Sequence, residues 1–440
     1  MPTMSLLDHV TDLHVEAPLP TMYRVRQHFD APDVGDIDAA VARQLTALDG
    51  RITPGMRVGV TAGSRGLANI PTILRAVGNE IRQRGGHPFI IPAMGSHGGA
   101  TAAGQEEVLE SYGITERTTA MPIVSAMDVQ QIGQLPDGPT VYMSTTALEA
   151  DALLIVGRVK PHTDFRADIE SGLAKIMTIG LGKHRGAQMI HSYGTAGLSR
   201  SLAPAARVMV QHANVLGALA ILENAYDDTA KLEFVEADGI GGPHETRLLN
   251  EARSLMASLP FDEIDVLVVQ EMGKNISGTG MDTNIIGRMM IVNVPEFKRP
   301  RIRIVAVLEL TDEAHGNGAG IGLADLLSRR AVEKLDLRAT YINGFTSGIG
   351  GVQRIKLPAF LPTDLDTIAA GILSCGRGDP QNARVVAIRN TLELSDLYVS
   401  ASLLDETEAH PRLDITDAGA KLPFDESGAL NLWAAVPAHA

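Results

Sequence analysis

Residues 152–162 read ALLIVGRVKPH, an apolar run followed at once by glycine, basic residues, proline and histidine. Two upstream stretches likewise have an apolar run followed by a glycine-containing loop: residues 56–66 (MRVGVTAGSRG) and residues 88–99 (PFIIPAMGSHGG). Continuous apolar runs of this length are typical of strands buried on both faces of a parallel sheet. Residues 70–84 carry apolar side chains at a helical period, so the sequence predicts an α/β fold built from strand–helix–strand units.

The loops that follow these three strands are predicted to lie together. In a parallel sheet the carboxyl ends of neighbouring strands face one edge, and ligands bind beyond that edge. Residues 61–66, 93–99 and 157–162 are therefore expected to line one edge of the sheet and to contribute to one site.

A second group of strands is predicted further along the chain, alternating with helices, at residues 261–269 (FDEIDVLVV), 301–310 (RIRIVAVLEL) and 384–388 (RVVAI). The sequence therefore predicts two α/β domains with mostly parallel sheets. Residues 1–262 form the domain with the site loops, and residues 263–440 form a domain that contributes substrate contacts. The weakly patterned tail from residue 407 onward can pack back across either domain.

Charge and composition disfavour several classes of protein. The 52 acidic and 38 basic residues give a net charge of −14, whereas a nucleic-acid partner needs clustered Lys and Arg. A single cysteine forms no intramolecular disulfide and suits a reducing compartment. The first twenty residues lack the pattern of a signal peptide, and the apolar runs are too short to span a bilayer. We therefore expect a cytoplasmic protein without a membrane partner.

The common signatures of several enzyme classes are absent from the sequence. No Gly-x-Gly-x-x-Gly follows a predicted strand, and no Walker A motif, His-Glu-x-x-His or Gly-x-Ser-x-Gly occurs. Three of the 13 histidines, His97, His162 and His191, lie in or close to the glycine-rich segments. Because histidine titrates near neutral pH and binds metals through its neutral ring, these three are candidates for acid–base or metal chemistry.

A longer ordered pattern includes these histidines. It comprises Ser96-His97 with Gly99-Ala100-Thr101, then Lys160-Pro161-His162, Ser171-Gly172-Leu173-Ala174-Lys175, Gly180 and His191, with Arg65 upstream. In order and spacing this pattern resembles the signature of the nickel-pincer-nucleotide-dependent lactate racemase family. The resemblance extends through both predicted domains, and it implies two α/β domains with the cofactor in the cleft between them.

The resemblance also implies a role for each site residue. Lys175 matches the lysine that bonds covalently to the pyridinium-derived cofactor, and His191 matches the histidine that ligates nickel. His97 and His162 match the pair of acid–base histidines, and Arg65 matches an arginine near cofactor and substrate. A nickel ion bound by imidazole and by soft sulfur agrees with the ligands that this metal accepts.

The implied activity is that of an isomerase, a racemase or epimerase of a 2-hydroxy acid. In the family's scheme one histidine takes the hydroxyl proton while a hydride moves from C2 to the cofactor, and the planar ketone accepts the hydride back on either face. Inversion needs a base on each side, hence two histidines. The resemblance further implies cofactor-biosynthesis proteins as partners, so protein made in a host without them is expected to lack the nickel-pincer nucleotide.

The sequence departs from the family pattern in the first domain and in the second. Ala62 and Gly66 stand where the family has Asp and Pro, and the interval from His162 to Lys175 is longer by about three residues. In the second domain the family's substrate contacts Tyr, Gln and Lys are replaced, and the residues here are Ile286, Gly287 and Met290. Lys274 or Arg288 is expected to supply a cation instead, and the substrate is expected to be a 2-hydroxy acid other than lactate.

Two other interpretations remain open at the level of sequence. One is a conventional metalloenzyme, a zinc or iron lyase or hydrolase, in which three protein side chains hold the metal and Lys175 binds substrate. The other is a catalytically silent homologue that binds a cofactor or a small anion.

Overall fold

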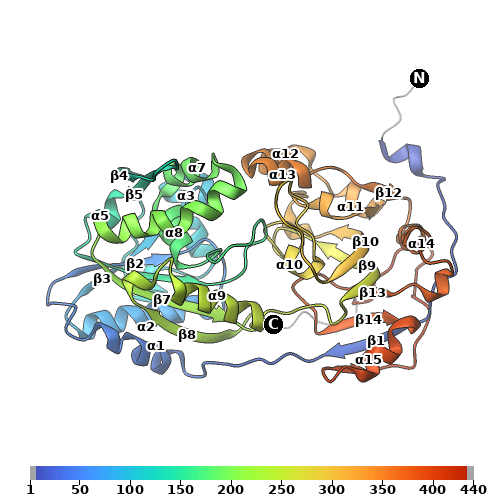
Figure 1. Cartoon of the computed structure of the whole chain (residues 1–440), viewed down its shortest axis with the longest axis horizontal. Coiled ribbons are helices and arrows are strands. Elements are labelled where there is room, and N and C mark those ends of the chain that lie inside the picture. The colour runs from blue at the N-terminus through green and yellow to red at the C-terminus, as the bar shows by residue number, and fades with distance from the viewer. Residues whose placement is uncertain (1–5, 434–440) are drawn as a thin grey trace. The chain divides into compact units, whose positions relative to one another are not determined.

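The structure is a computed structural model that describes residues 6–433. The chain divides into two compact units (Figure 1): residues 30–256 form one, and residues 6–29 join residues 257–433 in the other. Each unit contains a mainly parallel sheet with helices, so the predicted fold class, α/β with two α/β domains, is confirmed. No helix within residues 6–433 is long and apolar enough to cross a membrane.

The unit of residues 30–256 is built on a five-stranded sheet of order β3-β2-β6-β7-β8, in which β8 alone is antiparallel to its neighbour. Its strands are β2 (Arg57–Ala62), β3 (His87–Pro92), β6 (Ala152–Arg158), β7 (Val215–Glu223) and β8 (Thr229–Val235), and a separate hairpin consists of β4 (Val129–Gln134) and β5 (Thr140–Ser144). Its helices are α1 (Ile37–Leu45), α2 (Ile70–Gln83), α3 (Ala102–Ser111), α4 (Glu116–Thr119), α5 (Thr145–Leu148), α6 (Leu173–Lys175), α7 (Lys183–His191), α8 (Gly194–His212) and α9 (Pro243–Leu255).

Both faces of this sheet are buried, as its continuous apolar strands predict. Along β6, Leu154 and Val156 belong to a core shared with α1 and α2, whereas Leu153 and Ile155 belong to a core shared with α6 to α9. The helical period over residues 70–84 is also confirmed, because the apolar face of α2 lies in the first of these cores.

The second unit contains an eight-stranded sheet of order β12-β11-β10-β9-β13-β14-β1-β15. The first five strands are parallel, and the last three pair antiparallel. The strands are β1 (Met22–Gln27), β9 (Glu263–Met272), β10 (Arg301–Leu310), β11 (Leu326–Ser328), β12 (Ala359–Leu361), β13 (Val385–Ile388), β14 (Asp396–Ser400) and β15 (Leu413–Ile415). The helices are α10 (Thr283–Ile286), α11 (Arg329–Glu333), α12 (Leu337–Thr346), α13 (Gly348–Arg354), α14 (Asp364–Ser374) and α15 (Leu404–Ala409).

The division of the chain differs from the expected boundary after residue 262. It lies after residue 256, and the N-terminal residues belong to the second unit because β1 is inserted between β14 and β15. Val25, fully buried, pairs with Leu397 on one side and Ile415 on the other. The tail from residue 407 packs within the second unit through β15 and the buried Trp433, and residues 434–440 lie outside the described range.

Candidate functional site

Three loops of the unit of residues 30–256 follow parallel strands at one edge of its sheet. β2 pairs in parallel with both β3 and β6, so the segments after Ala62, Pro92 and Arg158 leave the sheet at the same edge. The sequence-based expectation that these loops share one edge is therefore confirmed. The loops carry Arg65, His97 and His162, respectively.

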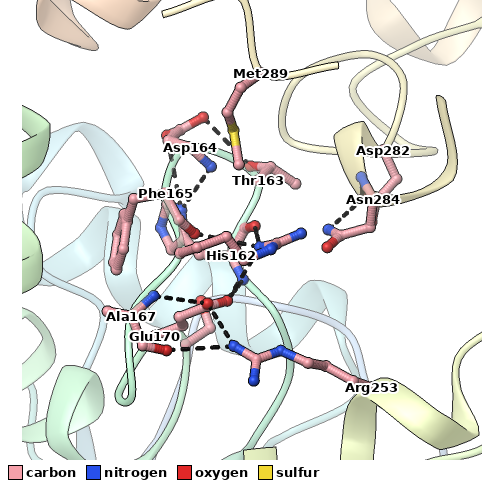
Figure 2. A network of polar contacts seen from close by, with 12 residues as sticks. His162, Thr163, Asp164, Phe165, Ala167, Glu170, Arg253, Asp282, Asn284 and Met289 are labelled. Carbon is pink, nitrogen blue, oxygen red and sulfur yellow. Dashed lines mark hydrogen bonds and ion pairs between the residues drawn. The ribbon is translucent and has the colours of Figure 1, made fainter. Parts of the chain in front are cut away.

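A buried carboxylate holds the loop after β6. Glu170, 1% exposed, accepts hydrogen bonds from the backbone N–H of His162 (2.7 Å) and of Ala167 (3.0 Å). Its carboxylate also pairs with Arg166 at 3.2 Å and with Arg253 at 2.6 Å. Figure 2 shows Glu170 between the loop and Arg253. The residues that lengthen the interval from His162 to Lys175 therefore supply the carboxylate that fixes the backbone of His162.

Neighbouring groups of this loop orient the His162 ring. The backbone N–H of Asp164 donates to Nδ1 at 3.0 Å, and the Phe165 ring stacks on the imidazole with centroids 4.4 Å apart (Figure 2). A nitrogen that accepts a hydrogen bond carries no proton, so the neutral ring of His162 carries its proton on Nε2.

The Nε2 atom of His162 lies 2.8 Å from Nζ of Lys175, whose amine also donates to Ser171 Oγ at 3.3 Å. Because Nε2 bears the proton, Nζ accepts that hydrogen bond through a lone pair, which only the neutral amine possesses. Electrostatics shifts the equilibrium toward that state: burial, together with the charges of Arg65 and Lys160, lowers the pKa of Lys175 to about 8 against the opposing charge of Asp164. Above about pH 8 the contact therefore describes a neutral lysine beside a neutral histidine.

A turn in the chain brings His191 toward Lys175. Sixteen residues in a straight helix would separate the two by about 24 Å. Instead α6 continues into a π-helical turn (Ile176–Leu181), Lys183 takes a left-handed φ of +53°, and α7 packs back against the turn. Gly182 is required there, since a Cβ would lie 2.3 Å from the carbonyl oxygen of Thr178.

His191 is exposed at the end of α7, yet it lies within electrostatic range of Lys175. Partial desolvation by surrounding protein lowers the pKa of its imidazole, the charge of Lys175 in its protonated form lowers it further, and Asp164 opposes both. A neutral imidazole is the form that ligates a metal. His191 and Lys175 thus lie within electrostatic range of one another.

Arg65 supplies an unpaired positive charge to the same edge. Within residues 6–433 its guanidinium has neither a hydrogen-bond nor an ion-pair partner. Desolvation lowers its pKa, Tyr112 opposes this, and the neighbouring charge of Arg158 contributes to it. Since Arg158 is itself paired with Glu223, Arg65 is the guanidinium at this edge that is left for an anion.

His97 is exposed on the loop after β3, and a buried lysine supports that loop. Lys183, 0% exposed, donates from Nζ to Pro92 O at 2.6 Å and to Gln105 Oε1 at 3.1 Å. Gln105 in turn donates to Gly95 O at 2.9 Å. Burial lowers the pKa of Lys183 to about 8.

The predicted substrate cations Lys274 and Arg288 belong to the other unit and are engaged there. Lys274 donates to Gly278 O at 2.5 Å and to Asn343 Oδ1 at 3.1 Å. The Arg288 guanidinium pairs with Asp325 at 2.6 Å and donates to the carbonyl oxygens of Leu323, Ile302 and Arg303. The terminal nitrogens of Arg288 therefore hold the backbone and Asp325 of its own unit.

Sequence reasoning missed four polar residues that shape this site: Glu170, Asp164, Gln105 and Lys183. None of the four belongs to a recognisable motif. In the sequence, these four residues are recognisable only as polar side chains in the segments that follow apolar strands. Such a position does not distinguish a buried residue that supports the site from an ordinary surface residue.

Comparison with known proteins adds one match. A family model described as "Domain of unknown function (DUF362)" matches residues 58–241. The matched range lies within the unit of residues 30–256 and includes Arg65, His97, His162, Lys175 and His191. No curated protein matches the chain.

Metal binding by protein side chains alone finds little support in the arrangement. Within the described residues, no three or more His, Cys, Asp or Glu side chains gather as a potential ligand set. A conventional zinc or iron site needs about three such ligands. A centre in which His191 is the one protein ligand needs no such set.

Proposed function

We propose that this chain is an isomerase, a racemase or epimerase of a 2-hydroxy acid other than lactate, which uses a nickel-pincer nucleotide bound covalently to Lys175. The observation that carries the proposal is the contact of 2.8 Å between Lys175 Nζ and His162 Nε2. This contact joins the expected attachment point to one of the two expected acid–base groups, with Arg65 and His191 in electrostatic range.

The residues of the site fit the proposed group. Covalent attachment needs an unprotonated amine, and the geometry at Lys175 favours that form. His191 would serve as the protein ligand to nickel, and Arg65 and Lys160 provide positive charge for anionic groups. When bound, the group supplies a hydride acceptor and a Lewis-acidic metal.

His162 would supply a proton to the substrate oxygen. With the cofactor held on Lys175, Nε2 would be available to substrate, and in the tautomer that the Asp164 N–H fixes it would give its proton to the C2 oxygen, so His162 would act as the acid of the pair. The Asp164 N–H and the Phe165 ring keep the imidazole in position during proton transfer. A positioned imidazole of this kind contributes about 10²- to 10⁴-fold to the rate of a reaction.

Arg65 and His97 complete the proposed set. The unpaired guanidinium of Arg65 would bind the carboxylate of a 2-hydroxy acid and so fix the position of C2. His97, on the adjacent loop, would hold or supply the proton when C2 is approached from its second face. Ile286, Gly287 and Met290 stand where the resembled family has its substrate contacts, and this difference favours a substrate other than lactate. The proposal places the protein in the cytoplasm with the proteins that synthesise the cofactor.

The test is production of the chain together with the cofactor-biosynthesis proteins. We expect a covalent adduct on Lys175, nickel bound to the protein, and interconversion of the enantiomers of a 2-hydroxy acid on a chiral column. The variant Lys175→Arg should lose all three, whereas Lys231→Arg, a change at a lysine outside the site, should retain them. Absence of both adduct and nickel from the folded wild-type chain would refute the proposal, and lactate as the best substrate would refute its substrate assignment.

A further inference from the structure

The Lys175 amine combines the features of a carbonyl-reactive lysine before any cofactor is attached. Its nitrogen is held 2.8 Å from a ring nitrogen that bears a proton, within range of the cations Arg65 and Lys160. We infer that, in the chain without cofactor, Lys175 is a binding site for 2-oxo acids, which it takes up as an imine. This inference concerns the free amine and does not depend on the proposed racemase activity.

The first step of imine formation needs a nucleophile and an acid in contact. The backbone N–H of Asp164 donates to Nδ1 of His162, so the ring proton is on Nε2. The neutral Nζ of Lys175 accepts that proton's hydrogen bond and supplies the lone pair. When that lone pair attacks a carbonyl carbon, the Nε2 proton loses its acceptor and faces the oxygen that becomes negative. His162 thus acts as the general acid for the same bond that Lys175 forms.

The class of ligand follows from the charge around the amine. Arg65 has no ion-pair partner within the described residues, and its positive charge acts on Lys175. A guanidinium binds a carboxylate through two parallel hydrogen bonds, which fixes the orientation of the group as well as its position. A ketone or aldehyde with an adjacent carboxylate satisfies both Arg65 and Lys175, whereas a simple ketone satisfies Lys175 alone.

The reaction is balanced without an oxidant or a reductant. The C–N bond forms between Nζ and C2 of the acid while the carbonyl π pair moves to oxygen, which takes a proton from His162 Nε2. One Nζ proton replaces it on the ring, and the ring relays the second Nζ proton to the hydroxyl group, which leaves as water when the C=N bond forms. The products are one imine and one water, and no atom changes its total oxidation level.

The inference predicts competition at a single nitrogen. A 2-oxo acid on Lys175 occupies the atom to which the proposed cofactor would bond, so the acid should slow cofactor attachment reversibly. The 2-oxo acid is also the oxidised form of the proposed substrate, which gives it the same carboxylate for Arg65.

The experiment traps the imine in the full chain purified from a host without the cofactor-biosynthesis proteins. The chain is incubated with pyruvate and sodium borohydride at pH 8, where hydride reduces the C=N bond to a stable secondary amine, and labelled lysines are identified by peptide mapping. The internal control is Lys231, whose partial burial is outweighed by hydrogen bonds to Glu233 and Glu251, so that its pKa is raised. At this pH the unprotonated fraction of Lys175 should exceed that of Lys231 about a hundredfold.

We expect Lys175 to be labelled at least ten times faster than Lys231, because its unprotonated fraction is about a hundredfold larger. Acetone, which lacks the carboxylate, should label Lys175 more slowly than pyruvate, and Arg65→Gln should reduce the preference for pyruvate. Equal labelling of Lys175 and Lys231 in the wild-type chain would overturn the inference, and this comparison requires no variant to fold. Equal labelling of Lys175 by acetone and pyruvate would overturn the assignment to 2-oxo acids.

The outcomes also separate this inference from the proposed function. A chain that carries the cofactor and racemises a 2-hydroxy acid, but whose free Lys175 is not trapped by pyruvate, refutes the imine alone. A chain that is trapped by pyruvate on Lys175, yet takes up neither adduct nor nickel from the biosynthesis proteins, refutes the proposed function alone.

Discussion

The backbone N–H of Asp164 occupies Nδ1 of His162, and this bond leaves the ring proton on Nε2, next to Lys175. The protonation of a lysine is thus governed by a main-chain group eleven residues earlier. Sequence reasoning placed His162 and Lys175 in one site through a family resemblance. It could not place them in contact, because the contact depends on Glu170, a buried carboxylate that no motif marks.

Lys183 is the second residue whose charge the fold disfavours, and it offers a test through stability. Its pKa is lowered from 10.5 in the unfolded chain to about 8 in the folded one, so folding favours the neutral amine. The contribution of Lys183 to stability therefore rises as the pH increases from about 8 to 10.5. The total rise is about 3 kcal/mol, because one pKa unit corresponds to about 1.4 kcal/mol.

The variant Lys183→Met lacks this titration. We expect urea unfolding to show that the free energy of unfolding of the wild-type chain, relative to Lys183→Met, increases between pH 7.5 and pH 10. Lys175 titrates in both proteins and cancels in the difference. A difference that stays constant with pH would show that Lys183 keeps an ordinary pKa in the folded chain.

At the scale of elements, the strands of the site and α2 could be predicted from the order of their apolar residues. The strands are continuous apolar runs, and α2 has apolar residues at a helical period over a segment long enough to recognise. The π-helical turn between α6 and α7 could not, since an i to i+5 hydrogen-bond pattern has no residue signature. The position of β1 was missed for another reason. A strand of six residues that pairs with a segment more than 350 residues later leaves no local signal of its partner.

The turn at Gly182 gives a prediction for this scale. An alanine there would place its Cβ 2.3 Å from Thr178 O, so α7 must shift away from the π-helical turn. We expect Gly182→Ala to cost about 1 to 3 kcal/mol of stability, the usual range for overpacking, and to weaken the effect of Lys175 on the pKa of His191.

Thermal unfolding and a histidine titration by NMR measure the two effects. Gly378→Ala is the matched control, because a Cβ there meets no atom within 4 Å and the backbone is not in the left-handed region. A Gly182→Ala chain that unfolds at the wild-type temperature, with an unchanged His191 titration, would mean that the turn tolerates a side chain.

At the scale of the whole molecule, composition and strand spacing sufficed to predict two α/β units, but not which residues belong to each. The unit of residues 30–256 holds Arg65, His97, His162, Lys175 and His191, and its sheet has a hydrophobic core on each face. The family match to residues 58–241 lies inside this unit. The unit therefore contains what an independently folding domain requires.

We expect residues 30–256, expressed as a separate fragment, to unfold in one cooperative transition and to keep the pKa of Lys175 well below 10.5. Circular dichroism on heating tests the first expectation, and amine labelling at Lys175 tests the second. A fragment without a cooperative transition would show that the unit needs residues 6–29 or 257–433 to fold.

The central claim is that Lys175, at its contact with His162, is a neutral amine above about pH 8, and its titration is the most direct measurement. In a chain labelled with ¹³C at lysine Cε, the signal that disappears in Lys175→Arg belongs to Lys175, and Lys183→Met identifies the other shifted lysine. We predict that the Lys175 signal titrates with a pKa of about 8. A pKa near 10.5, that of an ordinary lysine, would contradict the account of the site and the two proposals built on it.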